Sequence, residues 1–267
     1  MGAVRRLIGI GLAVAAVVAA GLMPNLPASA AGPAANGTYL ARGDSVAFGF
    51  VPAEAAMPPP DHPDASFFVG YPEDVGQALR LGVWNASCPG ETTDSMLVAG
   101  APSNGCENSP DGSPGYRTLY PLHVQYQGTQ MQYALKYLAA HRHTRLVTIN
   151  IGSNDAFLCL EITSDGCAAE FPGVLKEIGA NLTAIYTQIR DVAHYQGLLV
   201  ALTYYLLDPG NPTLVARTEA LNNVITSVTE AFGGKVADGF AGFEGPSAAF
   251  GGDPCAAGLL IKLPDVL

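Results

Sequence analysis

The sequence predicts an α/β fold, a three-layer sandwich in which helices cover both faces of a central parallel sheet. Apolar runs of strand length alternate with longer segments whose apolar residues recur at helical spacing. The run 146–151 is rich in β-branched residues and almost continuously apolar, which is typical of a central strand covered on both faces. Strands that alternate with helices in this way form parallel sheets with right-handed crossovers.

The first half of the chain alternates predicted strands with helix starts and long loops. Gly43 permits a tight turn after the first strand, and Pro72 opens a helix with two acidic residues in its first turn. In chain order we expect a strand ending at 39–41, a helix starting at Ser45, a loop over 50–70, a helix from Pro72 to Gly82, a strand over 83–86 and an irregular segment over 99–127. A loop as long as the last one often lines a functional site.

The second half continues the alternation with longer helices. Apolar residues from Phe171 to Val192 keep helical spacing over about six turns, which predicts one buried face. In chain order we expect a helix over 130–143, the strand over 146–151, a long helix from Pro172, a strand over 197–206, a further helix and a weak last strand over 236–240.

Residues 1–30 have the composition of a secretory signal peptide. Two arginines precede an uncharged apolar run over 7–22, and Ala-Ser-Ala at 28–30 supplies small residues for cleavage. The alternative is a membrane anchor, because the apolar run approaches the shortest length that spans a bilayer. We expect cleavage after about Ala30 and a secreted, extracellular protein with no stable membrane anchor.

The remaining residues, 31–267, form a single predicted domain. Of all residues 13% are charged and 49% are apolar, which is enough for a sizeable core, and no linker or repeat divides the chain. Cleavage removes two arginines and no acid, so the formal net charge changes from −10 to −12. A net negative surface argues against nucleic acid and anionic membranes as partners. We expect a monomer.

Five cysteines follow the leader, at positions 88, 106, 159, 167 and 255. In an oxidising compartment the simplest pairing joins Cys88 to Cys106 and Cys159 to Cys167, each across a short loop. Each bridge would contribute about 2–4 kcal/mol by restricting the unfolded chain. Metal ligation is the competing interpretation, but no Cys-x-x-Cys pair or nearby histidine supports it. Cys255 is left unpaired.

Three conspicuous residues follow three of the predicted strands: Ser45, Gly90 and Asn154. Each has an ordinary alternative, since serine is a common N-cap, glycine a turn residue and asparagine a loop cap. The carboxyl ends of parallel strands meet at one edge of the sheet, where ligands bind. A serine nucleophile, with a backbone N–H and a side-chain amide as oxyanion donors, fits acyl transfer.

Three short blocks around these residues resemble the SGNH (GDSL) hydrolases in sequence, order and spacing. The blocks are Gly-Asp-Ser-Val-Ala-Phe-Gly at 43–49, Ser-Cys-Pro-Gly-Glu-Thr-Thr at 87–93 and Ile-Gly-Ser-Asn-Asp at 151–155. The resemblance runs from about Thr38 onward and is closest to secreted bacterial lipase-like esterases. It implies a flavodoxin-like sheet and a carboxylic ester hydrolase that acts on small-molecule or lipid acyl esters without a cofactor.

The same resemblance assigns roles to single residues. Ser45 would be the nucleophile, and its own N–H, the Gly90 N–H and the Asn154 side chain would form the oxyanion hole. Asp44 and Asp155 belong to the blocks as well, and we expect them to act as structural hydrogen-bonding groups.

The family's fourth block, an Asp-x-x-His near the C-terminus, has no counterpart in the last part of this chain. No histidine follows Asp253, and Cys255 has no evident partner. We therefore expect a chain that is truncated relative to its relatives and lacks their last helix. His141, His143 and His194 precede strands, so we expect them at the amino edge of the sheet, opposite Ser45.

His62 and His123 lie in loops connected to the carboxyl edge, which makes them the candidate stand-ins for the missing base. The ordinary alternative for both is a solvated or loop-packing histidine. General base catalysis typically contributes about 10²–10⁴-fold, so a serine without a base is a poor nucleophile. The sequence thus predicts a secreted serine ester hydrolase of impaired activity; the alternative is an inactive SGNH-like binding protein or a truncated fragment.

Overall fold

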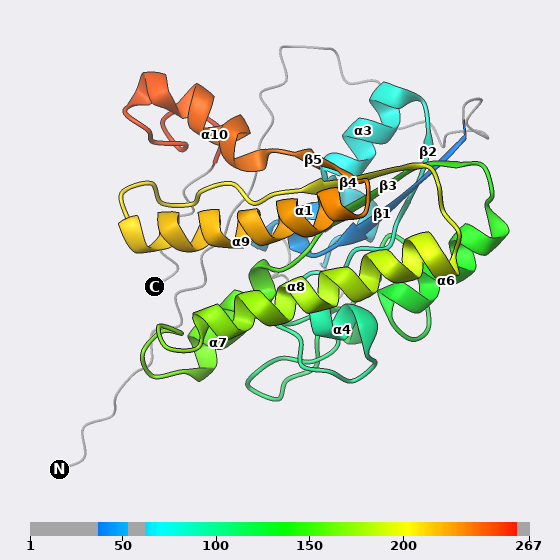
Figure 1. Cartoon of the computed structure of the whole chain (residues 1–267), viewed down its shortest axis with the longest axis horizontal. Coiled ribbons are helices and arrows are strands. Elements are labelled where there is room, and N and C mark those ends of the chain that lie inside the picture. The colour runs from blue at the N-terminus through cyan, green and yellow to red at the C-terminus, as the bar shows by residue number, and fades with distance from the viewer. Residues whose placement is uncertain (1–36, 53–61, 261–267) are drawn as a thin grey trace.

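The computed structural model describes residues 37–52 and 62–260 and contains a three-layer α/β/α sandwich (Figure 1). The expected leader, residues 1–30, lies outside the described residues. The described strands form one parallel sheet in the order β2-β1-β3-β4-β5, which is the flavodoxin-like order. The predicted fold class is confirmed. The strands are β1 (Thr38–Gly43), β2 (Gly82–Asn85), β3 (Thr144–Asn150), β4 (Leu198–Leu202) and β5 (Lys235–Ala237).

Helices cover both faces of this sheet. Figure 1 shows α3 above the strands and α6 and α8 below them, while α9 packs against α8 and β4. The α-helices are α1 (Ser45–Phe48), α3 (Tyr71–Leu79), α4 (Thr93–Leu97), α5 (Tyr116–Leu119), α6 (Gln130–Ala140), α7 (Ser153–Ile162), α8 (Phe171–Thr187), α9 (Pro212–Ala231) and α10 (Gly239–Ser247). Short 3-10 turns lie at Ala65–Phe67 and Ala248–Phe250, and a π-helical turn, η2 (Gln188–Val192), extends α8.

The main hydrophobic core lies between the sheet and α6, α8 and α9. Val147 and Ile149 of β3 join Leu182 and Ile185 of α8 and Leu221 of α9 in one buried cluster. Each fully buried aliphatic side chain contributes about 1.5–3 kcal/mol through the hydrophobic effect. This cluster packs along the central strand β3 up to its carboxyl end, where the predicted site lies.

A smaller cluster covers the other face of the sheet. Tyr39, Ala41 and Leu146 are buried there, and Val75 of α3 packs against them. The Tyr39 hydroxyl lies 2.7 Å from the Thr148 hydroxyl, which satisfies both buried groups. Strand β1 therefore alternates its side chains between the two faces, as a central strand does.

Arg42 of β1 is an exception to the apolar filling of the main core. Its side chain is fully buried, and its Nη1 donates a 3.1 Å hydrogen bond to the Met131 sulfur. Among the described residues, Nε and Nη2 of Arg42 have no hydrogen-bond partner. Burial lowers the pKa of this guanidinium to about 10, because an apolar environment disfavours its charge.

The strand predicted over 197–206 ends early, as β4 does at Leu202. After Leu202, the side chain of Asn222 of α9 makes the backbone hydrogen bonds that a neighbouring strand would otherwise make. Its Oδ1 accepts a 2.9 Å hydrogen bond from the Tyr204 N–H, and its Nδ2 donates a 2.8 Å bond to the Tyr204 carbonyl. A side-chain amide can satisfy both backbone groups of one residue, so the apolar run continues where the sheet does not.

Helices α7 and α10 were not predicted. Helix α7 begins directly after Gly152, so the block that carries Asn154 reads as a loop although it forms the first helical turn. Helix α10 contains three glycines and Pro246, which lower its helix propensity, and the predicted strand over 236–240 runs into its start. In both cases tertiary packing overrides a weak local signal.

Two disulfides are present. Cys88–Cys106 has an S–S distance of 2.08 Å and Cys159–Cys167 one of 1.94 Å, and both pairs are buried. Cys255 is unpaired and exposed. In the part of the chain that the structure describes, no helix has the length and apolar character needed to cross a membrane.

Candidate active site

Ser45 is the first residue of α1, directly after the end of β1. The N-cap is Asp44, whose Oδ1 accepts a 3.0 Å hydrogen bond from the Val46 N–H. The Asp44 N–H in turn donates to the Asn150 carbonyl of β3 at 3.1 Å. Ser45 is therefore not the helix cap, which was its ordinary interpretation. Asp44 provides the capping oxygen, so the serine hydroxyl is not needed for that purpose.

Asp44 links this turn to two distant segments. Its Oδ2 accepts hydrogen bonds from the Tyr204 hydroxyl at 2.5 Å and from the Ser153 hydroxyl at 3.2 Å. The carboxyl group is fully buried, which raises its pKa to about 6, although these bonds and the one from Val46 lower it again. The segment after β4 and the start of α7 are thus fixed against the Ser45 turn.

The backbone of Val69 and Gly70 packs closely against α1 and the glycine that ends it. A Cβ atom added to Gly49 would lie 2.4 Å from the Val69 carbonyl carbon, and one added to Gly70 would lie 2.5 Å from the Ala47 carbonyl oxygen. Real Cβ atoms do not approach other atoms so closely, so both positions require glycine. Asn85 of β2 donates a further 2.8 Å hydrogen bond to the Ala47 carbonyl.

Gly90 lies in the turn that follows β2. It has a φ of +81°, and a Cβ there would come within 2.3 Å of the Asn104 carbonyl oxygen. The Asn104 N–H donates a 2.8 Å hydrogen bond to the Gly90 carbonyl. Together with the Cys88–Cys106 disulfide, this contact attaches the irregular segment over 99–127 to the Gly90 turn.

The side chain of Asn154 lies beside the same turn. Its Nδ2 donates a 3.0 Å hydrogen bond to the Glu91 carbonyl, and its Oδ1 accepts a 3.1 Å bond from Asn104 Nδ2. These contacts fix the orientation of the amide. Because a side-chain amide carries two N–H donors, the bond to Glu91 uses one of them and leaves a second for another acceptor.

Asp155 connects α7 to α4. Its carboxylate accepts hydrogen bonds from the Thr93 N–H at 3.0 Å and from the Thr93 hydroxyl at 2.5 Å. The packing around this carboxyl group raises its pKa to about 7. Asn181 of α8 donates to the Thr93 hydroxyl at 3.0 Å. Asp155 therefore contacts structural groups of neighbouring helices, in the manner that the sequence predicts.

Of the two candidate stand-in histidines, His123 contacts α1 and His62 packs against the tyrosines of α5 and the residue after it. His123 Nε2 is 3.0 Å from the Phe48 carbonyl, and its ring centroid is 4.6 Å from that of Phe48. His62 Nε2 is 3.1 Å from the Tyr116 hydroxyl, and its ring stacks on Tyr120 at 3.6 Å. His123 thus contacts the last residue of the helix that Ser45 begins.

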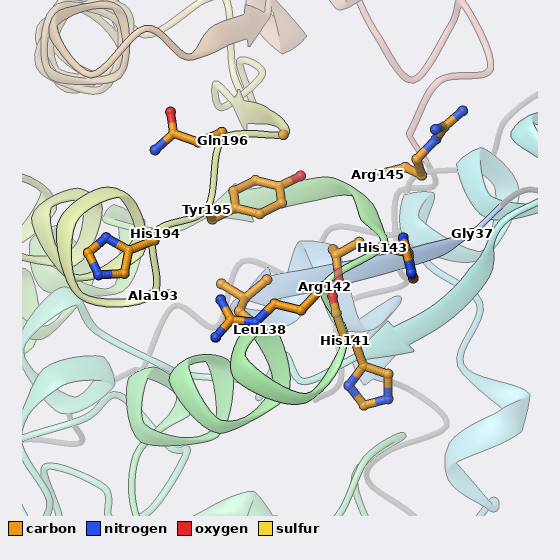
Figure 2. A pocket seen from close by; sticks show the side chains of 12 residues that line it. Gly37, Leu138, His141, Arg142, His143, Arg145, Ala193, His194, Tyr195 and Gln196 are labelled. Carbon is orange, nitrogen blue, oxygen red and sulfur yellow. Dashed lines mark hydrogen bonds between the residues drawn. The ribbon is translucent and has the colours of Figure 1, made fainter.

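The other three histidines lie at the opposite edge of the sheet. His141, His143 and His194 line an open groove of about 540 Å³ together with Gly37 and Gly197, which directly precede β1 and β4 (Figure 2). Figure 2 shows these side chains spread around the groove rather than directed at one point. The sheet separates this groove from Ser45.

One of these histidines belongs to an Asp-x-x-His sequence that lies well before the C-terminus. Asp191-Val-Ala-His194 has the letters and spacing of the family's fourth block. It lies in and directly after η2, and His194 lines the groove at the amino edge. The Asp-x-x-His spacing alone therefore identifies a segment at the amino edge of the sheet, at the end opposite Ser45.

Comparison with solved structures gives similarities of low sequence identity. A lipase, Lip_vut3 from a goat rumen metagenome, is 17% identical and has a TM-score of 0.48, over 78% of this chain and 83% of that chain. An extracellular lipase from Streptomyces rimosus is 18% identical with a TM-score of 0.44, over 78% and 82% of the two chains. An aryl esterase from M. smegmatis is 18% identical with a TM-score of 0.45, over 76% and 83%.

The search of curated protein sequences found no match. A protein-family model, described as the GDSL-like Lipase/Acylhydrolase family, matches residues 41–255. This range contains Ser45, Gly90 and Asn154 and most of the described sheet. The chain therefore belongs to the GDSL-like lipase/acylhydrolase family of carboxylic ester hydrolases.

Proposed function

We propose that this protein is a serine ester hydrolase in which Ser45 is the nucleophile. The Ser45 N–H, the Gly90 N–H and the second N–H of Asn154 Nδ2 would donate to the oxyanion. The observation that carries the proposal is the hydrogen bond from Asn154 to the Glu91 carbonyl, because it holds the amide directly beside the Gly90 turn. Donors fixed in advance stabilise the developing charge without reorganisation.

The proposed reaction proceeds in two steps. The Ser45 oxygen forms a bond to the ester carbonyl carbon, the alcohol leaves as the ester C–O bond breaks, and an acyl-enzyme remains. Water then attacks the acyl carbon and releases the acid and free Ser45. Each step needs a group that accepts and returns a proton.

The proton acceptor limits the expected rate. His62 and His123 are the candidate stand-ins, but His123 Nε2 already lies 3.0 Å from the Phe48 carbonyl, and His62 Nε2 lies 3.1 Å from the Tyr116 hydroxyl. A serine hydrolase without its base loses about 10²–10⁴-fold in rate. We therefore expect low but Ser45-dependent turnover.

The second candidate function is binding of an acyl ligand without turnover. The observation that favours it is the placement of His141, His143 and His194 at the amino edge, which leaves them unable to activate Ser45. Saturable binding of a short-chain acyl amide, with no hydrolysis of the matching ester, would support this function.

The substrate and the cellular location belong to the same proposal. Small-molecule or lipid acyl esters are the expected substrates of a member of this family. Secretion is supported by the composition of residues 1–30 and by two disulfides, which persist in oxidising compartments.

The experiment is hydrolysis of a short-chain nitrophenyl ester by the purified protein, by Ser45→Ala and by Ser113→Ala. Ser113 is an exposed loop serine and serves as the matched control. We expect Ser45→Ala to abolish the enzymatic rate and Ser113→Ala to retain it. Equal rates for the wild-type protein and Ser45→Ala would contradict catalysis by this serine.

A further inference from the structure

Gln130 is a fully buried polar residue that the sequence interpretation did not include. It is the first residue of α6, after the N-cap Thr129. Its side chain contacts the backbone of Gly43 twice: Oε1 accepts a 3.1 Å hydrogen bond from the Gly43 N–H, and Nε2 donates a 2.8 Å bond to the Gly43 carbonyl. Gly43 is two residues before Ser45.

The end of β2 explains why a side chain occupies this place. The regular pairing of β1 with β2 ends at Ala41 and Asn85, although the Ala86 N–H still bonds to the Ala41 carbonyl at 2.9 Å. The Gly43 carbonyl still receives the Cys88 N–H at 3.1 Å, but the Gly43 N–H bonds to Gln130. The Gln130 amide therefore acts as one extra peptide group beside β1, with its donor and its acceptor both in use.

The second hydrogen of the same amide reaches the oxyanion side of the site. Gln130 Nε2 donates a 2.6 Å hydrogen bond to Glu91 Oε2, and Glu91 Oε1 accepts one from the Ser95 hydroxyl at 2.5 Å. Glu91 is 2% exposed and follows Gly90 directly. Its backbone carbonyl is the acceptor for Asn154 Nδ2.

A continuous series of hydrogen bonds thus connects the two halves of the proposed site. It runs from the Gly43 backbone through the Gln130 amide to the Glu91 carboxylate, and the Glu91 carbonyl continues it to Asn154. All its members are buried, so water does not compete for these bonds.

We propose that Gln130 is a positioning residue, whose side-chain amide sets the distance between the Ser45 turn and the Gly90 and Asn154 donors by bridging Gly43 and Glu91. This inference rests on the proposed function of Ser45. Gln130 does not touch the reacting atoms; it acts through the backbone of Gly43 and the carboxylate of Glu91. The alternative is a purely structural role in which Gln130 only stabilises the fold.

The experiment compares Gln130→Met, Gln130→Glu and the control Gln132→Met. Methionine has nearly the shape of glutamine but does not replace its N–H donors. Glutamate keeps an acceptor for the Gly43 N–H, but it replaces the NH₂ group, whose two hydrogens bond to the Gly43 carbonyl and to Glu91, by an oxygen that carries at most one hydrogen. Gln132 lies on the same helix and is exposed, and its side chain accepts the Thr129 N–H at 3.3 Å in the capping box at the start of α6. Two readouts are needed: kcat and KM for the Ser45-dependent hydrolysis, and hydrogen exchange of single amides by NMR.

We expect Gln130→Met to lower kcat by about 100-fold and to change KM by less than about threefold, because a misplacement near 1 Å has an effect of this size. The Gly43 amide should exchange at least about tenfold faster relative to the Asp44 amide, which bonds to Asn150 instead. Gln130→Glu should lower kcat but keep the Gly43 amide protected. Gln132→Met should leave kcat, KM and this exchange ratio unchanged.

The two proposals fail in different ways. Equal hydrolysis by the wild-type protein and Ser45→Ala would contradict the proposed function and with it a catalytic role for Gln130. Ser45-dependent hydrolysis with an unchanged kcat in Gln130→Met would contradict only the role of Gln130, as would a change in KM alone. If Gln130→Met does not fold, Gln130→Glu decides, since an unchanged kcat in that variant also overturns the inference.

Discussion

Arg42 and Asp44 are two charged residues on one short stretch of chain, and both are fully buried, yet their surroundings differ completely. Asp44 receives hydrogen bonds from Tyr204, Ser153 and the Val46 N–H. Arg42 has a single bond, to the Met131 sulfur, and two of its nitrogen atoms lack a partner among the described residues.

The comparison shows that burial of a charged group does not by itself identify a functional position. A buried polar group whose bonds are all made holds its neighbours in one arrangement, as Asp44 holds α7 and the segment after β4. A buried charge whose hydrogen bonds are mostly unmade costs free energy. The number of satisfied bonds, rather than the depth of burial, distinguishes Asp44 from Arg42.

The largest expected effect is a gain in stability for Arg42→Leu. Leucine suits the surrounding apolar cluster and removes the unpaired guanidinium, so we expect the free energy of unfolding to rise by about 3–4 kcal/mol. Urea unfolding measures this change. Arg42→Lys keeps the buried charge and should give no gain, and the exposed Arg142→Leu should stay within about 0.5 kcal/mol of the wild-type protein. A destabilised Arg42→Leu would show that the guanidinium has a partner after all.

The second expected effect concerns pH. The pKa of Asp44 is about 6 in the folded protein and that of an unfolded aspartate is near 3.9, so the folded state binds the proton more tightly. The contribution of Asp44 to stability is therefore greatest below about pH 4 and decreases as the pH rises through 6, by about 2–3 kcal/mol. Asp44→Asn, which can still cap α1, should remove this part of the decrease between pH 4 and 7.

Thermal or urea unfolding at a series of pH values tests this prediction. Glu91 and Asp155, whose pKa values are also raised to about 7 by burial, should keep part of the slope in the variant. A slope that is identical in Asp44→Asn and the wild-type protein would contradict it.

The smallest expected effect is that of Tyr204→Phe. The variant deletes the hydroxyl that donates to Asp44 and leaves the ring in place, so it should destabilise the protein by about 1–2 kcal/mol near pH 7. The loss should shrink below pH 5, where Asp44 is protonated in the folded state. Tyr205→Phe, at the next position, is the matched control. A loss that does not depend on pH would mean that the hydroxyl does not act through Asp44.

The fold could be predicted from the sequence because its signals are local. The apolar run of β3 and the helical spacing of α8 depend on residues near one another in the chain. The C-terminal end of β4 could not be predicted, since it depends on Asn222, which lies on a later helix. The sequence does not predict α7 for a related reason. Its first turn is also part of the block at 151–155 that carries Asn154.

The residues of the candidate site also fall into those that the sequence predicts and those that it does not. Ser45, Gly90 and Asn154 could be named because each lies within a recognisable block, and the structure brings the turns that hold Gly90 and Asn154 together. Gln130 could not be named, because its role arises only when α6 places it beside the end of β1. A glutamine at the start of a helix has no local pattern that separates it from a solvent-exposed one.

The contact between Gly49 and Gly70 has a consequence for how such proteins diversify. The two ends of the segment between these glycines meet backbone to backbone, directly behind α1. Because both ends of this segment lie at one fixed point, the segment can be lengthened, shortened or exchanged without displacing α1. Doubling the length of a loop costs only about 0.6 kcal/mol in closure entropy. The position is thus a natural insertion point, at which substrate preference can be redesigned while Ser45, the proposed nucleophile, keeps its place.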